Sequence, residues 1–229
     1  MKTEIKYAPK NLNEIVYPDD ATKNRILAYG SGVLTGHIIL HGPNGTGKTT
    51  VANLLPHAID GDNANIENKH FKEIFAQKNI GDYVLKACSS NYLYESTKYY
   101  MVFHEFDYAK GDLAEFWTAA DKCENLMIII TTNNIMDVHQ SIRSRCNMIE
   151  MGPVMVNRLL PRALEILNAE GVDLPVAQIQ SLLHESEKFG DWRVYCRRMD
   201  EMIYSYHAGF LKPDNKIKKP ALKIVNPVK

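Results

Sequence analysis

The sequence lacks both a long apolar run and a cluster of cysteines. Its apolar runs, such as Met127–Ile130, are far shorter than the roughly 20 residues that a membrane helix needs, and residues 1–10 form no apolar signal core. No C-x-x-C pair or histidine cluster accompanies the four scattered cysteines, which are Cys88, Cys123, Cys146 and Cys196. Neither a zinc site nor a disulfide framework is therefore predicted. We expect a cytoplasmic protein with reduced, mostly buried thiols and no membrane partner.

The sequence also lacks an excess of charge of one sign, because 27 Lys and Arg balance 27 Asp and Glu. Residues 208–229 hold six Lys and one Asp, a charge of +5, which leaves −5 for residues 1–207. The main part of the chain thus has no basic footprint typical of tight DNA binding, so a local stripe or an assembled ring would have to supply it. The segment 208–229 is expected to be a flexible, solvated tail; contact with DNA or a partner protein is the alternative.

Apolar runs alternate with helix-compatible sequence over the first two thirds of the chain. One run precedes Gly42, two more cover 99–105 and 125–133, and a weaker one covers 147–151. Continuous apolar strands that alternate with helices favour a parallel sheet with helices on both faces. With 229 residues, the chain can bury one sizeable core and a small second one.

The pattern changes after Gly152-Pro153, where three amphipathic helices are predicted. They cover residues 162–171, 175–190 and 191–207, with Asp191 as the N-cap of the third. We therefore predict an α/β domain over 1–154, a three-helix domain over 155–207 and the basic tail over 208–229.

The strongest chemical motif is G-x-x-x-x-G-K-[ST], which begins at Gly42 and lies between a predicted strand and a predicted helix. In such a loop, backbone N–H groups and the helix N-terminus surround phosphates. Lys48 would reach the outer phosphates, and Thr49 would offer its hydroxyl to Mg²⁺. The residues predicted to hold the nucleotide here are Gly42, Asn44, Gly45, Thr46, Gly47, Lys48, Thr49 and Thr50.

Polar residues follow two of the other strands. Glu105 and Asp107 come after one strand, and Thr132-Asn133 follows the next. Ligands of open α/β sheets bind at the carboxyl ends of strands. We predict that Glu105 activates the attacking water and that Asn133 holds that water or senses the γ-phosphate. Asp107 is a secondary candidate for Mg²⁺.

These motifs occur in a recognisable order. The segments are KYAPK (6–10), GPNGTGKTT (42–50), VFHEFD (102–107), IIITTNN (128–134), SIRSRC (141–146) and GDWR (190–193). The sequence resembles the AAA+ ATPase subunits of sliding-clamp loaders, in particular the replication factor C small subunit and bacteriophage group. The resemblance covers residues ~4 to ~207, and S-R-C together with G-D-x-R is its most specific part.

The resemblance implies a P-loop NTPase of the AAA+ type with a helical lid domain. It also implies ATP and Mg²⁺ as cofactors, ATP being favoured over GTP because no N-K-x-D is present. Other AAA+ subunits, a sliding clamp and primer-template DNA are the implied partners, and DNA replication is the implied process.

The resemblance further implies roles for particular residues. Arg145 matches the arginine finger that reaches the γ-phosphate bound by a neighbouring subunit. Arg193 matches the lid arginine that couples ATP to lid closure. Tyr7 and Val16 match the segment that walls the adenine, although Ala8 stands where the family usually has Arg.

Two features depart from the family pattern. His104 stands where the family has the Asp that fixes Mg²⁺ through water, and imidazole is a poor replacement for a carboxylate at this hard cation. A loss of ~10- to 100-fold, typical of such indirect defects, predicts slow turnover and not a dead site. The chain also ends 22 residues after His207, without the helical collar that holds such rings together, so ATP, DNA or another subunit is expected to bring neighbours to Arg145.

Two functions remain open. The first is an ATP-driven replication factor, a clamp-loader-like subunit that grips DNA or a clamp. The second is a nucleotide-gated binding module with little hydrolysis that regulates a replication or mobile-element partner. The presence of both Glu105 and Arg145 favours the first, because a module without hydrolysis needs neither a water-activating carboxylate nor a trans arginine.

Overall fold

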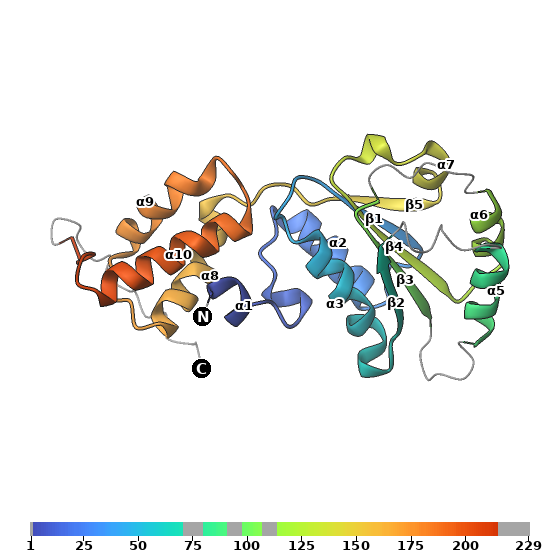
Figure 1. The fold of residues 1–229 in the computed structure, drawn as a ribbon, viewed down its shortest axis with the longest axis horizontal. Coiled ribbons are helices and arrows are strands. Elements are labelled where there is room, and N and C mark those ends of the chain that lie inside the picture. The colour runs from blue at the N-terminus through green and yellow to red at the C-terminus, as the bar shows by residue number, and fades with distance from the viewer. Residues whose placement is uncertain (1, 71–79, 91–97, 107–113, 215–229) are drawn as a thin grey trace, which may run out of the picture. The chain divides into compact units, whose positions relative to one another are not determined.

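The computed structural model describes residues 2–70, 80–90, 98–106 and 114–214. They form two compact units (Figure 1). The first, here the α/β unit, is Pro9–Val154. The second, here the helical unit, contains the residues before Pro9 together with those from Met155 onward.

The α/β unit is built on a five-stranded sheet in which all strands run parallel, as predicted. The strand order is β2-β3-β4-β1-β5. The strands are β1 (His37–His41), β2 (Asn65–His70), β3 (Tyr99–His104), β4 (Leu126–Thr132) and β5 (Cys146–Glu150). Strand β2 was not predicted, whereas the apolar runs correctly indicated the other four.

Helices cover both faces of this sheet, as Figure 1 shows. Alternate strand residues pack on opposite faces: Met101, Phe103 and Ile128 belong to one apolar cluster, and Val102 and Ile129 belong to the other. The first cluster is completed by α5 (Ile80–Ser90), α6 (Ala114–Ala120) and α7 (Gln140–Arg143), and the second by α2 (Asp20–Gly30) and α3 (Lys48–Asp60). Short 3₁₀ turns η1 (Leu12–Glu14), η2 (Gly61–Asn63) and η4 (Ile135–Asp137) complete the described part of the unit.

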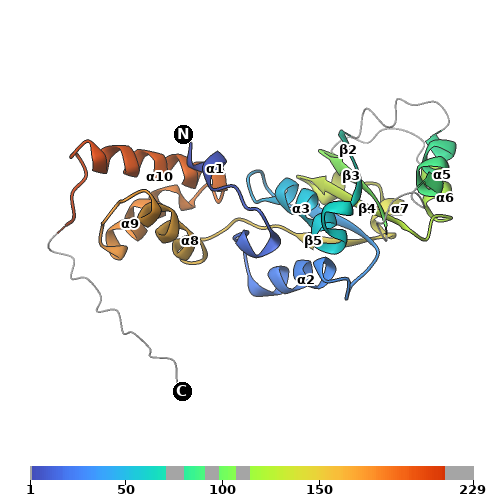
Figure 2. The same ribbon diagram turned by 90° about the horizontal axis from the view of Figure 1, so that it is seen from below.

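The helical unit contains the three predicted helices, which are α8 (Val156–Ala169), α9 (Val176–Glu187) and α10 (Trp192–His207). Figure 2 shows them from a second direction. Helix α8 begins before the predicted Arg162 and contains Pro161. Its first N–H is satisfied by the side chain of Glu187, whose Oε1 accepts from Val156 N at 2.8 Å. This bond is the main reason that the pKa of Glu187 lies below its usual range.

The first eight residues belong to the helical unit, which differs from the predicted 1–154 boundary. Helix α1 (Thr3–Lys6) packs against α10, and Thr3 donates to the Asp200 carboxylate from its backbone N at 2.9 Å and from its hydroxyl at 2.5 Å. Tyr7 donates its hydroxyl to Glu170 at 2.6 Å. Polar contacts between segments far apart in the sequence thus set this boundary, and no local pattern signals them.

The tail predicted to start at residue 208 also differs over its first seven residues. Gln178 donates to the carbonyl of Lys212 at 3.0 Å and accepts from Asp214 N at 2.9 Å. Residues 208–214 are therefore held by the helical unit, and residues 215–229 lie outside the described part.

The prediction that most of the cysteine side chains are buried is confirmed. All four cysteines are free, and Cys88, Cys146 and Cys196 are buried. Burial raises the pKa of both Cys146 and Cys196 to about 12, which keeps these thiols protonated. Among the described residues, no helix combines the length and apolarity needed to cross a membrane.

Candidate functional site

The predicted phosphate loop connects β1 to α3 and folds around the ammonium group of Lys48. This group donates to the carbonyl oxygens of Gly42 at 2.7 Å and Pro43 at 2.6 Å. Thr46 donates its hydroxyl to the same Pro43 oxygen at 3.0 Å. Helix α3 starts after Gly47 with no side-chain cap, so its first N–H groups and its positive dipole end serve the loop. This is the arrangement that binds phosphate.

Two glycines let the backbone take this path. At Gly42 φ is +139°, and an added Cβ would lie 2.2 Å from the Met151 carbonyl oxygen. At Gly47 φ is +88°, and an added Cβ would touch Met151 Cε at 3.9 Å and Ile15 Cγ2 at 4.0 Å. Glycine is therefore required at Gly42 by the close approach to the Met151 backbone and at both positions by the positive φ. This glycine-rich turn, with Lys48 and the uncapped start of α3, fits a bound nucleotide.

The Gly42→Ala variant should lose nucleotide binding and melt at a lower temperature. Strain at such a backbone conformation costs about 1–3 kcal/mol, and overlap with Met151 adds to it. Thermal melting and titration with a fluorescent ATP analogue measure both effects. Gly32→Ala is the control, because Gly32 also has a positive φ of +73° but has nothing within 4 Å of its added Cβ. Equal losses in the two variants would show that contact with Met151 is unimportant.

The carboxyl ends of β3 and β4 lie on the same side of the sheet as the phosphate loop, which follows the carboxyl end of β1. In the sheet, β4 lies between β1 and β3, and Thr132 pairs with His41, the residue before Gly42. The chain after β3 is held to β4, because Glu105 N donates to Thr131 Oγ1 at 3.3 Å and Phe106 N donates to Thr131 O at 2.9 Å. Lys48, Glu105 and Asn133 thus follow three neighbouring strands, which are β1, β3 and β4. The outer two of these, β1 and β3, lie two strand spacings apart, a distance of ~10 Å.

Glu105 has an unusual backbone. Its φ of +52° makes it the one non-glycine residue with positive φ in the described part of the chain. Such a conformation costs about 1–3 kcal/mol and is concentrated at functional sites. The side chains of Glu105 and Asn133 are both exposed, just after the carboxyl ends of β3 and β4. This arrangement leaves the carboxylate and the amide accessible to a ligand.

The oxygen donors predicted for Mg²⁺ are only partly described. Thr49 is exposed on the first turn of α3, and His104 is the half-buried last residue of β3. Asp107 lies outside the described residues. Within the described ranges, no group of three or more His, Cys, Asp or Glu residues is arranged to hold a metal ion.

Arg145 lies at the amino ends of the strands, whereas the phosphate loop lies at their carboxyl ends. It precedes Cys146, which pairs with His37 at the start of β1, whereas the phosphate loop follows the end of β1. The four residue steps from His37 to His41 span ~13 Å. Arg145 is therefore not brought together with the phosphate loop of its own chain.

Arg193 and Tyr7 belong to the helical unit, and Val16 is half-buried in the α/β unit. Arg193 follows the N-cap of α10 and makes two parallel bonds to Asp191, from Nε at 3.1 Å and from Nη2 at 2.8 Å. The bond to Asp191 raises the pKa of Arg193. Burial opposes ionisation of Asp191, but its bonds with Arg193 outweigh this, and the pKa of the carboxyl is lowered. The ion pair therefore persists at neutral pH.

The sequence alone did not point to Ile15 and Met151, the two apolar residues beside Gly47. It also gave no sign of a groove of about 670 Å³ near the carboxyl ends of β1 and β5. Its lining includes Pro18, Asp19, Thr22, His41, Glu150 and Pro153. Ile15 lies within IVYP (15–18), so the resemblance could have suggested it. Met151 and the groove come from chain packing, which leaves no local signal.

A phosphate loop at the switch from strand to helix, with a carboxylate and an amide on neighbouring strand ends, defines a P-loop nucleotide-binding protein. Residues 38–153 match the family described as "ATPase family associated with various cellular activities (AAA)". This match spans half of the chain, and the protein belongs to this family of ATPases.

Relatives of this chain include sliding-clamp-loader large subunits of two phages. The subunit of Enterobacteria phage T4 is 29% identical over 86% of this chain, and that of Escherichia phage RB69 is 30% identical over 86%. The replication factor C small subunit of Archaeoglobus fulgidus is 25% identical over 82%. The chain is thus an AAA+ ATPase related to clamp-loader subunits, and it spans 63% of the length of the phage proteins and 59% of the archaeal one.

Solved structures share the fold. A variant of RuvB from Thermotoga maritima matches with a TM-score of 0.68 and 18% identity, over 90% of this chain and 68% of that protein. At this identity the likeness concerns the fold alone. It agrees with the parallel sheet and the helices that follow it.

Proposed function

We propose that this protein is a clamp-loader-like ATPase subunit that hydrolyses ATP at interfaces between subunits and acts in DNA replication. The observation that carries the proposal is the position of Arg145. A finger at the amino end of β5, ~13 Å along the sheet from the phosphate loop, suits a phosphate bound by another subunit. Primer-template DNA and a sliding clamp are the proposed partners, in keeping with the names of the relatives.

Each site residue has a role in this proposal. When bound, ATP supplies the bond to be hydrolysed, and Mg²⁺ neutralises charge on its phosphates. Lys48 and the N–H groups at the start of α3 hold the phosphates, and Thr49 offers a hydroxyl to the metal. Glu105 takes a proton from the attacking water, which Asn133 positions. Arg145 of a neighbour and Arg193 stabilise charge at the γ-phosphate, while Tyr7 and Val16 face the adenine.

Turnover is slowed by His104 in this proposal, and His104→Asp should raise the ATPase rate by ~10- to 100-fold. A carboxylate at the end of β3 would order Mg²⁺ and its waters better than imidazole does. The rate measured against Mg²⁺ concentration tests this, with His57→Asp as the control because His57 is exposed near the far end of α3. If His104→Asp leaves the rate and its Mg²⁺ dependence unchanged, metal handling does not limit turnover.

The experiment that tests the function is the ATPase rate per subunit, measured over a range of protein concentrations with and without primed DNA. A site completed by a neighbour predicts that the rate per subunit rises with concentration and that DNA lowers the concentration needed. A rate per subunit that stays constant under both conditions would contradict the proposal.

The second candidate, a nucleotide-gated binding module, is favoured by one observation, which is His104 at the end of β3. It predicts that ATP promotes assembly while any residual hydrolysis does not depend on Glu105, so Glu105→Gln would leave both assembly and the low rate unchanged. A loss of rate in Glu105→Gln, with nucleotide still bound, therefore distinguishes the two functions.

A further inference from the structure

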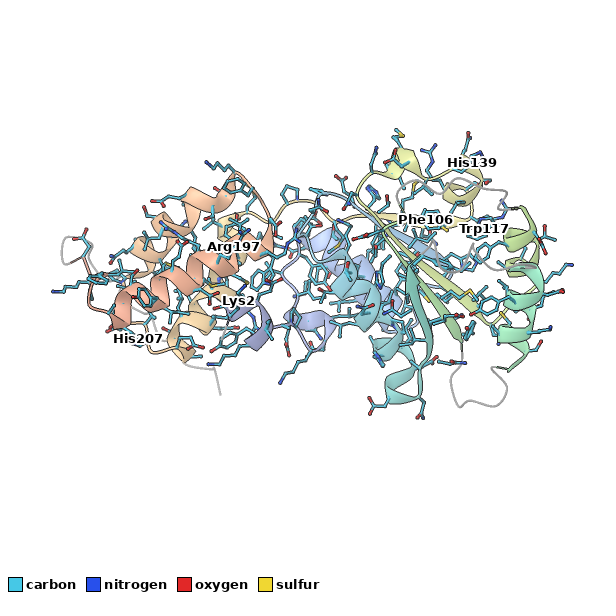
Figure 3. The ribbon with its side chains drawn as sticks, viewed as in Figure 1. Lys2, Phe106, Trp117, His139, Arg197 and His207 are labelled. Atoms are coloured by element: carbon cyan, nitrogen blue, oxygen red, sulfur yellow. The ribbon has the colours of Figure 1, made fainter. Side chains whose placement is uncertain are left out.

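The guanidinium group of Arg145 is held from three directions by residues of its own chain. Its Nε and Nη2 donate to the Asp121 carboxylate at 3.3 Å and 3.2 Å. Its Nη1 donates to the Ser141 carbonyl oxygen at 3.0 Å. The group also lies 5.8 Å from the centre of the Trp117 ring. Figure 3 labels Trp117 on α6.

The residues that hold Arg145 are themselves fixed by packing. Trp117 is 3% exposed and packs edge-on against Phe116, with the centres of the two rings 5.2 Å apart. Asp121 directly follows α6, and its backbone N donates to the Trp117 carbonyl at 2.8 Å. Ser141 lies on α7, whose Ile142 is fully buried. The residues that contact Arg145 therefore lie on or directly beside helices that are anchored in the core through Trp117 and Ile142.

These bonds leave donors available. A guanidinium has five N–H groups, and the contacts with described residues use one each on Nε, Nη1 and Nη2. One N–H on each terminal nitrogen remains, which is the pair that binds a phosphate with two bonds. The side chain of Arg145 is 39% exposed, so this pair can reach solvent or a neighbouring subunit.

The ion pair contributes little to the stability of the fold. The Asp121 side chain is 50% exposed, and exposed ion pairs are worth ~0–1 kcal/mol. A contact with so small a stabilising effect still restricts the rotamers of a long side chain. Preorganised donors raise the rate because they need not be ordered when the reaction occurs.

We propose that Asp121 is a positioning residue that orients Arg145 for the nucleotide bound by the neighbouring subunit. This inference rests on the proposed function, because it presupposes that Arg145 acts in trans. Asp121 touches no reacting atom itself. It works by fixing the direction of the guanidinium over the Trp117 ring.

The test is a mixing experiment with two full-length chains. The acceptor carries Arg145→Ala, so it binds ATP and can hydrolyse it but offers no finger. The donor carries Glu105→Gln, so it offers the finger but lacks its own water-activating carboxylate. Mixing should produce activity that neither chain has alone. Placing Asp121→Ala in the donor then changes only the finger offered to the acceptor, since the donor does not hydrolyse.

The expected result is that the donor with Asp121→Ala gives an acceptor kcat about 2- to 5-fold lower, with the same KM for ATP, because a contact worth up to ~1 kcal/mol changes the population of the oriented rotamer by that factor. A donor with Asp121→Glu, which keeps a carboxylate, should restore part of the rate. Glu124→Ala in the donor is the control, because Glu124 is exposed three residues away and has no hydrogen bond or ion pair with any residue that the structure describes. Equal melting temperatures of the donors exclude a folding defect.

An unchanged or increased kcat with the Asp121→Ala donor would overturn the inference while leaving trans action intact. If the acceptor and the unmodified donor give no activity on mixing, although wild-type protein hydrolyses ATP, the proposed function itself fails. The two failures are thus distinguishable.

Discussion

Arg145→Ala should lower the ATPase rate about 10³-fold or more, with little change in nucleotide affinity. Fingers supplied by a neighbour are worth roughly this factor because they neutralise charge that develops only in the transition state. The residue lies at the amino end of β5, whereas the phosphate loop follows the carboxyl end of β1, so it adds nothing to nucleotide binding by its own chain. Steady-state ATPase and binding of a fluorescent ATP analogue measure the two quantities.

Lys122→Ala is the matched control for this prediction. It also removes a positive charge next to Asp121, but Lys122 is exposed and forms no hydrogen bond or ion pair through its side chain among the described residues. If both variants lose the same activity, the loss of a positive charge near Asp121, and not the loss of an arginine finger, would explain the effect. An Arg145→Ala protein as active as the wild type would exclude the finger role.

Glu105→Gln should lower the rate by about 10²- to 10⁴-fold while nucleotide binding persists, the range typical of a lost general base. Glutamine has the same shape as glutamate but cannot take a proton from water. It also has a Cβ and the same backbone demands, so the strain at a φ of +52° is matched between the two proteins. Rapid-quench measurement of one turnover separates the chemical step from product release.

Asp137→Asn is the control for Glu105, because Asp137 is an exposed acid in η4, soon after β4. The general-base role predicts that Asp137→Asn retains the rate. If Glu105→Gln hydrolyses ATP as fast as the wild type while the nucleotide binds, another group must activate the water.

Strands β1, β3 and β4 were predictable because they lie inside the sheet, are buried on both faces and appear as continuous apolar runs, whereas the edge strand β5 was predicted from a weaker run. In β4 every residue from Leu126 to Thr132 is buried. Strand β2 is different: its sequence, NIENKH, contains a single apolar residue, and it lies at the edge of the sheet. Edge strands need fewer apolar residues, so hydrophobic patterning could not detect it.

The site was predictable where chemistry depends on local spacing. The glycines of the phosphate loop and Lys48 are close in sequence, and the structure gives Gly42 and Gly47 the positive φ values that require glycine. The contact between Arg145 and Asp121 joins residues 24 positions apart, and α6 and α7 create it only by packing. The attachment of Thr3 to Asp200, 197 positions away, was equally invisible in the sequence.

The most direct test of the account is an experimental structure of the full chain assembled with ATPγS and Mg²⁺. The account predicts a triphosphate surrounded by the backbone N–H groups that precede Lys48, with Arg145 of an adjacent copy or partner AAA+ subunit within hydrogen-bond distance of the γ-phosphate. An assembly in which Arg145 faces solvent at every interface, or a phosphate loop that stays empty at millimolar ATPγS, would contradict it.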